Sequence, residues 1–163
     1  MPMTPAYQQL VSYWLKGHAE ACQFIDTVFD IAHVLDDLTD RDTPVSTAQV
    51  QSAFRSALID LPRNPFYAQH FATLNAALHM AYLNWLASNE LEAEPGEYAK
   101  DVPFILRSSY VDLITICACI IGGEAWAVQV AADARVNASN EGKVKYLASL
   151  KEEKRRNLIV EGT

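Results

Sequence analysis

The chain of 163 residues has little cysteine and little glycine, with three and six residues respectively. The cysteines are odd in number, and Cys117 and Cys119 lie in an apolar run. This pattern excludes a disulfide framework and predicts reduced thiols in a cytoplasmic protein. The chain also lacks Asn-Gly and Asp-Gly dipeptides and any sustained alternation of apolar and polar residues. A hairpin-based all-β fold is therefore excluded.

Positive charge is scarce as well. The chain has 13 Lys and Arg against 20 Asp and Glu, which gives a net charge of −7. Because such a chain repels the phosphate backbone, we expect no nucleic-acid partner. The first residues lack the basic and apolar regions of a secretory signal, and the uncharged run at residues 113–123 is too short to cross a bilayer. We therefore expect no membrane contact.

The signature motifs of P-loop NTPases, dinucleotide-binding folds, serine hydrolases and HExxH metalloproteases are absent. What the chain does contain is helical periodicity in a sequence that is 50% apolar. Tyr7, Leu10, Val11 and Trp14 follow the spacing of one helical face, and Ser46 with Gln49 forms a capping-box pattern. Residues 1–163 are thus predicted to form a single all-α domain, a compact bundle of six or seven helices.

The helical pattern also predicts element boundaries and a core. The segments 17–40 and 102–121 are expected to be central helices, a helix beginning at Ser46 is expected to end near Ile59 because of Pro62, and residues 88–96 are expected to form a loop. The residues expected to be buried are Phe24, Ile31, Leu35, Leu78, Trp85, Leu113 and Ile116.

An acidic helix is the strongest functional signal, since six of the ten aspartates fall between Asp26 and Asp42. Asp26, Asp30, His33, Asp37 and Asp40 follow one another at spacings of 4, 3, 4 and 3, which places them on one helical face. Aspartate is unfavourable inside a helix, and like charges one turn apart repel each other. The pattern therefore favours a function that requires short carboxylates on this helical face.

Carboxylates on successive turns suit a hard divalent cation such as Mg²⁺, and a histidine among them extends the range to Mn²⁺ or Fe²⁺. The candidate metal ligands are Asp26, Asp30, His33, Asp36, Asp37 and Asp40. Two other interpretations remain open at this point: a solvated acidic face and an acidic face that docks another protein.

Residues 36–40 read DDLTD, a DDxxD motif preceded by an apolar helix. This segment resembles the first aspartate-rich motif of the terpenoid and isoprenyl diphosphate synthase family. The resemblance implies that Asp36, Asp37 and Asp40 hold Mg²⁺ ions that grip a substrate diphosphate. Asp133, Asn137 and Glu141 have the spacing of the family's second motif, although the chain is about half the length of such synthases.

Two functions follow as hypotheses. The first is a protein that binds Mg²⁺ or Mn²⁺ together with a diphosphate-bearing small molecule. One form of this hypothesis is a Mg²⁺-dependent enzyme that acts on this molecule. The second is a non-enzymatic helical interaction protein, such as an immunity or phage-type regulator, whose acidic face docks a basic protein partner. A homodimer is compatible with both.

Overall fold

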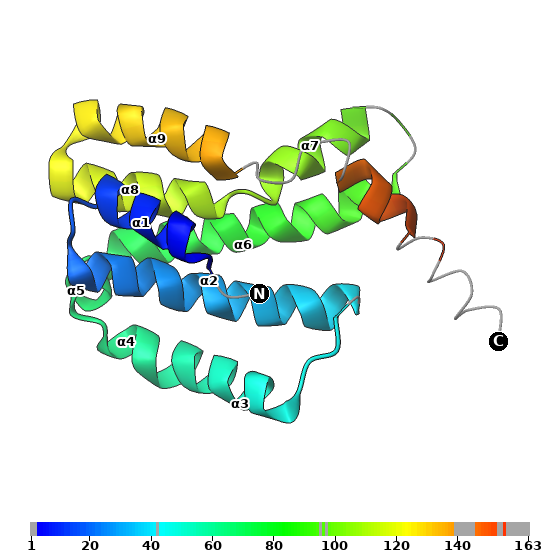
Figure 1. The fold of residues 1–163 in the computed structure, drawn as a ribbon, viewed down its shortest axis with the longest axis horizontal. Helices are drawn as coiled ribbons and strands as arrows, with labels where there is room; N and C mark the ends of the chain where they lie inside the picture. Colours follow the sequence, from blue (N-terminus) through cyan, green and yellow to red (C-terminus); the bar gives the residue numbers. More distant parts are fainter. Residues whose placement is uncertain are drawn as a thin grey trace.

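The computed structural model describes residues 3–41, 43–94, 96, 98–138, 146–152 and 155. Every regular element within these residues is helical, which confirms the all-α prediction. The elements are α1 (Pro5–Trp14), α2 (Ala19–Asp40), α3 (Thr47–Arg55), a π-helical turn η1 (Ser56–Asp60), α4 (Leu61–Arg63), α5 (Pro65–Gln69), α6 (Phe71–Ala93), α7 (Tyr98–Leu106), α8 (Tyr110–Gly122) and α9 (Glu124–Ala138) (Figure 1). Residues 146–152 are also helical.

Side-chain caps explain where several helices begin. Thr4 accepts a hydrogen bond from a backbone N–H of the first turn of α1, and Asn64 does the same for α5. The predicted capping box is confirmed: the Ser46 hydroxyl accepts from the Gln49 backbone, and the Gln49 side chain accepts from the Ser46 backbone. These bonds satisfy amide groups that have no partner inside the helix.

Three predicted boundaries are wrong, each for a local reason. The helix that starts at Ser46 does not end near Ile59 but runs through η1 into α4. In a regular α-helix, a proline ring clashes with the carbonyl four residues before it. Here the Leu61 N–H donates to the Ser56 carbonyl, five residues earlier, and this wider turn accommodates Pro62.

The predicted loop at residues 88–96 is largely helix, because α6 continues to Ala93. The buried Ser88 hydroxyl donates to the Trp85 carbonyl at 2.7 Å, so this polar residue is accommodated inside the helix. The predicted helix 102–121 is divided into α7 and α8 by a turn at residues 107–109. Arg107 lies in this turn and reaches carboxylates on other helices.

The core lies where α1 and α2 meet α8 and α9. Trp14, Phe24 and Ile114 are completely buried there, and the Trp14 indole donates to Asp133 of α9 at 2.7 Å. In Figure 1, α8 and α9 lie on one side of α2, and α3 and α4 lie on the other. The three cysteines are free, with Cys117 buried in α8.

The segment Asp101–Gly122 has the length and mean hydropathy, 1.8 over its most apolar window, that a membrane-crossing helix requires. One third of that window is buried within the protein, and Val111, Leu113 and Ile114 of α8 are part of the core. Core helices pass the same test, so length and composition alone do not assign a membrane role.

Of the predicted core residues, Phe24 and Leu113 are confirmed as buried. Ile31, Leu78, Trp85 and Ile116 are only partly buried, and Leu35 is exposed. All of these residues except Phe24 and Ile116 line one hollow in the molecule.

Candidate functional site

The helical segment of residues 47–63, comprising α3, η1 and α4, is called the arm here. It packs against α2, yet no residue of α3 or η1 is buried, and Leu61 is the only buried residue of α4. A short helix in a protein owes most of its stability to the packing of one apolar face. The arm therefore has unusually little packing of this kind within the described chain.

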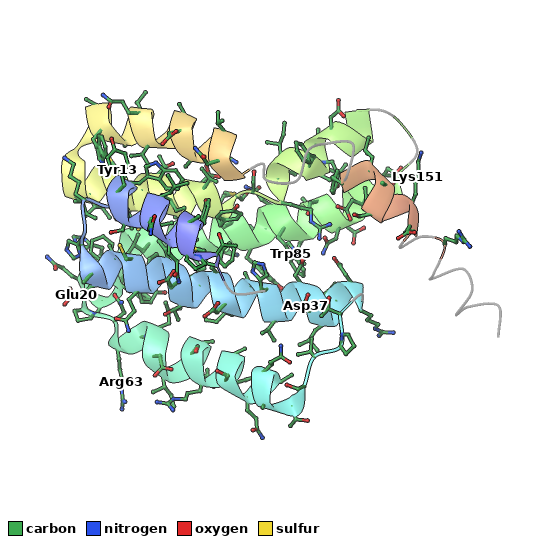
Figure 2. The ribbon with its side chains drawn as sticks, in the orientation of Figure 1. Tyr13, Glu20, Asp37, Arg63, Trp85 and Lys151 are labelled. Atoms are coloured by element: carbon green, nitrogen blue, oxygen red, sulfur yellow. The ribbon has the colours of Figure 1, made fainter. Side chains whose placement is uncertain are left out.

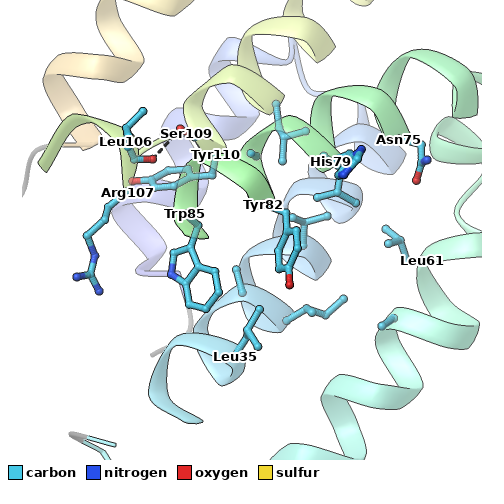
Figure 3. A pocket seen from close by; sticks show the side chains of 17 residues that line it. Leu35, Leu61, Asn75, His79, Tyr82, Trp85, Leu106, Arg107, Ser109 and Tyr110 are labelled. Carbon is cyan, nitrogen blue, oxygen red and sulfur yellow. Dashed lines mark hydrogen bonds between the residues drawn. The ribbon is translucent and has the colours of Figure 1, made fainter. Parts of the chain in front are cut away.

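A groove with a volume of about 500 Å³ lies between the arm, α2, α6 and the start of α8 (Figure 3). Its lining is mainly apolar and consists of Val28, Ile31, Ala32 and Leu35 from α2, Ala57 and Leu61 from the arm, Asn75, Leu78, His79, Ala81, Tyr82 and Trp85 from α6, and Leu106, Arg107, Ser109, Tyr110 and Leu113 from the α7–α8 region. The volume falls within the range of ligand-binding pockets.

The apolar surface continues beyond the groove along the arm. Phe54 and Leu58 lie one turn apart, adjoin Ala57 and Leu61, and are 62% and 71% exposed. The opposite flank of the arm is polar: Gln49, Ser52 and Ser56 line a smaller hollow together with Asp30 and Asp37 of α2. The arm is thus apolar on the groove side and polar on the side of these aspartates.

On α6 the wall consists of Leu78, Tyr82 and Trp85, which are spaced by four and three residues and so face the same side. The Tyr82 and Trp85 rings stack with centroids 6.2 Å apart. Figure 2 shows Trp85 pointing from α6 toward α2. Leu86, one turn after Tyr82, is another exposed apolar residue.

An ion-pair cluster closes one end of the groove. The Arg107 guanidinium lies 3.2 Å from an Asp36 oxygen, 2.9 Å from Asp40 and 2.8 Å from Glu92. The Trp85 indole N–H also donates to Asp36, at 2.9 Å. This cluster joins α2, α6 and the α7–α8 turn.

The protonation equilibria of the cluster follow from this packing. Burial lowers the pKa of Arg107, but the carboxylates of Asp36, Glu92 and Asp40 outweigh that effect and raise it above its ordinary value. Burial and the charge of Asp36 raise the pKa of Asp40 despite its contact with Arg107. The Tyr146 hydroxyl donates to Glu92 at 2.6 Å, and burial together with this bond raises the pKa of Tyr146.

The other predicted metal ligands lie further along α2. Asp26 is partly buried, and burial followed by the charge of Asp30 raises its pKa, while a hydrogen bond from Gln8 opposes the shift. The His33 Nδ1 lies 3.0 Å from the Phe29 carbonyl. Because a carbonyl only accepts, Nδ1 is the donor in this hydrogen bond.

The structure therefore divides the six candidate ligands: Asp36 and Asp40 lie at Arg107, whereas Asp30, His33 and Asp37 line the hollow beside the arm. Across the part of the chain that the structure describes, no three His, Cys, Asp or Glu side chains are grouped so as to hold a metal ion. The Mg²⁺ or Mn²⁺ site stays a prediction.

The second motif implied by the family resemblance is only partly described. Asp133 accepts hydrogen bonds from Trp14 and, at 3.1 Å, from Asn137 on the next turn of α9. Glu141 lies outside the described residues. The role that the resemblance gives these residues also stays a prediction.

The sequence interpretation missed Arg107 and Glu92 as part of the site. The signal was present, since Arg107 stands alone between two apolar helical runs. A basic residue in such surroundings requires carboxylate partners. Which carboxylates it meets depends on how α2 and α6 pack, and no local pattern contains that information.

Negative charge lies at the end of the groove rather than along its lining, in which Arg107 is the only Asp, Glu, Lys or Arg among the described side chains. The three carboxylates of Asp36, Asp40 and Glu92 surround that one guanidinium, which leaves an excess of two negative charges there (three minus one). The helices α2 and α6 together contain eight Asp and Glu and no Lys or Arg.

Searches against family models, curated proteins and solved structures give no match.

Proposed function

We propose that this protein is a non-enzymatic interaction protein that binds an amphipathic, basic helix of a protein partner in the groove. The observation that carries the proposal is the apolar groove between the arm and α6, together with its exposed apolar rim. Helix-in-groove recognition uses such a surface, into which a partner helix places apolar residues from successive turns.

The rim favours a macromolecular partner over a small molecule. Phe54, Leu58 and Leu86 are exposed large apolar residues that lie outside the lining of the groove itself. A small molecule inside the groove would leave them in water, whereas a helix laid along it would cover them. Extended apolar surface on a soluble domain commonly marks a protein interface.

The charge of the partner helix follows from the carboxylates at the end of the groove. Because Asp36, Asp40 and Glu92 surround the single guanidinium of Arg107 there, a helix with basic flanks is attracted and an acidic one is repelled. The acidic helix then contributes to partner choice and association rate, while apolar burial supplies most of the affinity.

The test uses a fluorescent Lys/Leu peptide designed as an amphipathic helix, and a scrambled peptide of the same composition. Fluorescence anisotropy should show that the wild-type protein binds the amphipathic peptide at least about tenfold more tightly, a difference of about 1.4 kcal/mol. Leu35→Asp and Leu58→Asp should remove this preference. Val136→Asp is the matched control, because Val136 is 77% exposed on α9, away from the groove.

Equal binding of the two peptides, or equal loss in the Val136→Asp control, would contradict the proposal. So would tight binding of the apolar dye anilinonaphthalene sulfonate that Leu35→Asp abolishes, Leu58→Asp leaves unchanged and the peptide does not displace. That result would assign the groove to a small apolar ligand.

A further inference from the structure

The molecule itself contains a helix that fits the proposed groove. The arm exposes Phe54 and Leu58 one turn apart, and it also contains Arg55 and Arg63. With Asp60 as its only acidic residue, the arm has a net charge of +1 (two arginines minus one aspartate), in a chain whose net charge is −7. It is an amphipathic helix with the charge that the carboxylates around Arg107, at the end of the groove, attract.

We infer that the groove is occupied by the arm of a second copy of this chain, so that two copies form a symmetric dimer. This inference rests on the proposed function, because it names the helix that the groove binds. In a twofold arrangement, each copy offers the same surface, and the arm of each copy covers the groove of the other. The contact closes on itself and leaves no groove open for further copies.

The weak packing of the arm supports a second copy as the occupant. Within one chain, α3 and η1 have no buried residue, although the segment contains Phe54, Leu58 and Ile59, all of them exposed. A dimer contact through the groove side of the arm buries Phe54 and Leu58. It provides the apolar packing that a short helix requires and that the single chain does not supply.

Electrostatics favour the same pairing. Arg55 pairs with Asp60 of its own arm at 3.6 Å, and the two side chains are 71% and 42% exposed, so this contact holds Arg55 weakly. In the dimer the carboxylates that surround Arg107 at the end of the second copy's groove offer Arg55 a further partner. An external partner helix then has to displace the arm of the second copy, which makes self-association a competitor of partner binding.

Sedimentation velocity and light scattering over a range of protein concentrations test the inference. The wild type and the Val136→Asp control should have twice the chain mass of 18.1 kDa. Leu58→Asp should have the mass of one chain and a circular dichroism spectrum that loses at most the helical signal of the arm. Arg55→Glu should weaken the dimer by about tenfold or more at low salt, and the effect should diminish as salt screens the charges. Leu58→Ser serves if Leu58→Asp fails to fold.

The outcomes separate this inference from the proposed function. A wild type that stays monomeric at all concentrations, yet binds the Lys/Leu peptide through Leu35 and Leu58, overturns the dimer and leaves the groove as a helix-binding site. A dimer that persists unchanged in both Leu58 variants also overturns the inference. A dimer that dissociates as the peptide is added supports both.

Discussion

The two halves of this molecule use apolar residues in different ways. Where α1, α2, α8 and α9 meet, the apolar side chains are completely buried, as with Trp14, Phe24 and Ile114. Around the arm and α6, side chains of the same kind line an open groove. Apolar residues at helical spacing occur in both halves, so this pattern does not separate them. The difference shows that periodicity identifies the apolar face of a helix but does not say whether the same chain covers it.

The largest expected effect comes from comparing one truncation in each half. Leu113→Ala should reduce the free energy of unfolding by about 2–5 kcal/mol, because Leu113 is buried and its loss leaves a cavity. Leu78→Ala should cost about 1 kcal/mol, since Leu78 is partly exposed on the groove wall and no closed cavity forms. Urea denaturation of dilute protein measures both. Equal losses would show that the groove is filled in solution.

The ion-pair cluster joins the two halves, and its removal should give the next largest effect. Arg107→Met leaves Asp36, Asp40 and Glu92 without the guanidinium that bridges them. We expect a loss of about 2 kcal/mol at neutral pH, less than for a fully buried pair because the side chains are partly exposed to water. Thermal denaturation of Arg107→Met and Arg107→Lys measures it. A variant as stable as the wild type would show that α2 and α6 are held together without this cluster.

Much of the fold follows from local signals, and the site follows from them only in part. The Ser46–Gln49 box is local, so α3 starts where the sequence places it. The π turn before Pro62 and the length of α6 depend on which neighbouring groups form hydrogen bonds with the backbone. The helix propensities of single residues do not describe these bonds. The groove is harder still to foresee, because it exists only through the distance between the arm and α6.

The acidic face shows the same limit. The spacing of Asp37 and Asp40 places them on one helical stripe, but in the folded chain Asp40 contacts Arg107 and Asp37 borders the polar side of the arm. The period of a helix predicts which residues share a face. It does not predict which residues from other helices meet that face.

A pH-dependent effect of intermediate size is expected at Asp26. Burial and Asp30 raise the pKa of Asp26 in the folded chain, so its ionised form is disfavoured and the folded state binds the proton more tightly than the unfolded state. Its contribution is therefore most favourable at acidic pH and is lost as pH rises through the folded-state pKa. Asp26→Asn should stabilise the protein at pH 7 by up to about 1 kcal/mol, and the gain should disappear below the ordinary pKa of aspartate.

Chemical denaturation of both proteins at several pH values measures this difference. Glu20→Gln, which removes an exposed carboxylate near the start of the same helix, is the matched control for the loss of one negative charge. A stabilisation by Asp26→Asn that is the same at acidic and neutral pH would contradict the assignment of the cost to the ionised carboxylate.

The smallest effect distinguishes the remaining interpretations of the acidic helix, and it concerns Asp37→Asn. Without metal this change should stabilise the protein by a few tenths of a kcal/mol, because it removes repulsion between carboxylates on successive turns. If this face only docks a partner, neither Mg²⁺ nor Mn²⁺ should shift the melting temperature of the wild type, in which Asp36 and Asp40 already bind Arg107. A site that binds metal would behave differently, because a ligand at 100 times its dissociation constant stabilises the folded state by about 2.7 kcal/mol. Calorimetry of both proteins with and without each ion measures the difference. A metal-dependent stabilisation that Asp37→Asn abolishes would contradict the interpretation of this face as a docking surface alone, and it would support the diphosphate-binding function instead.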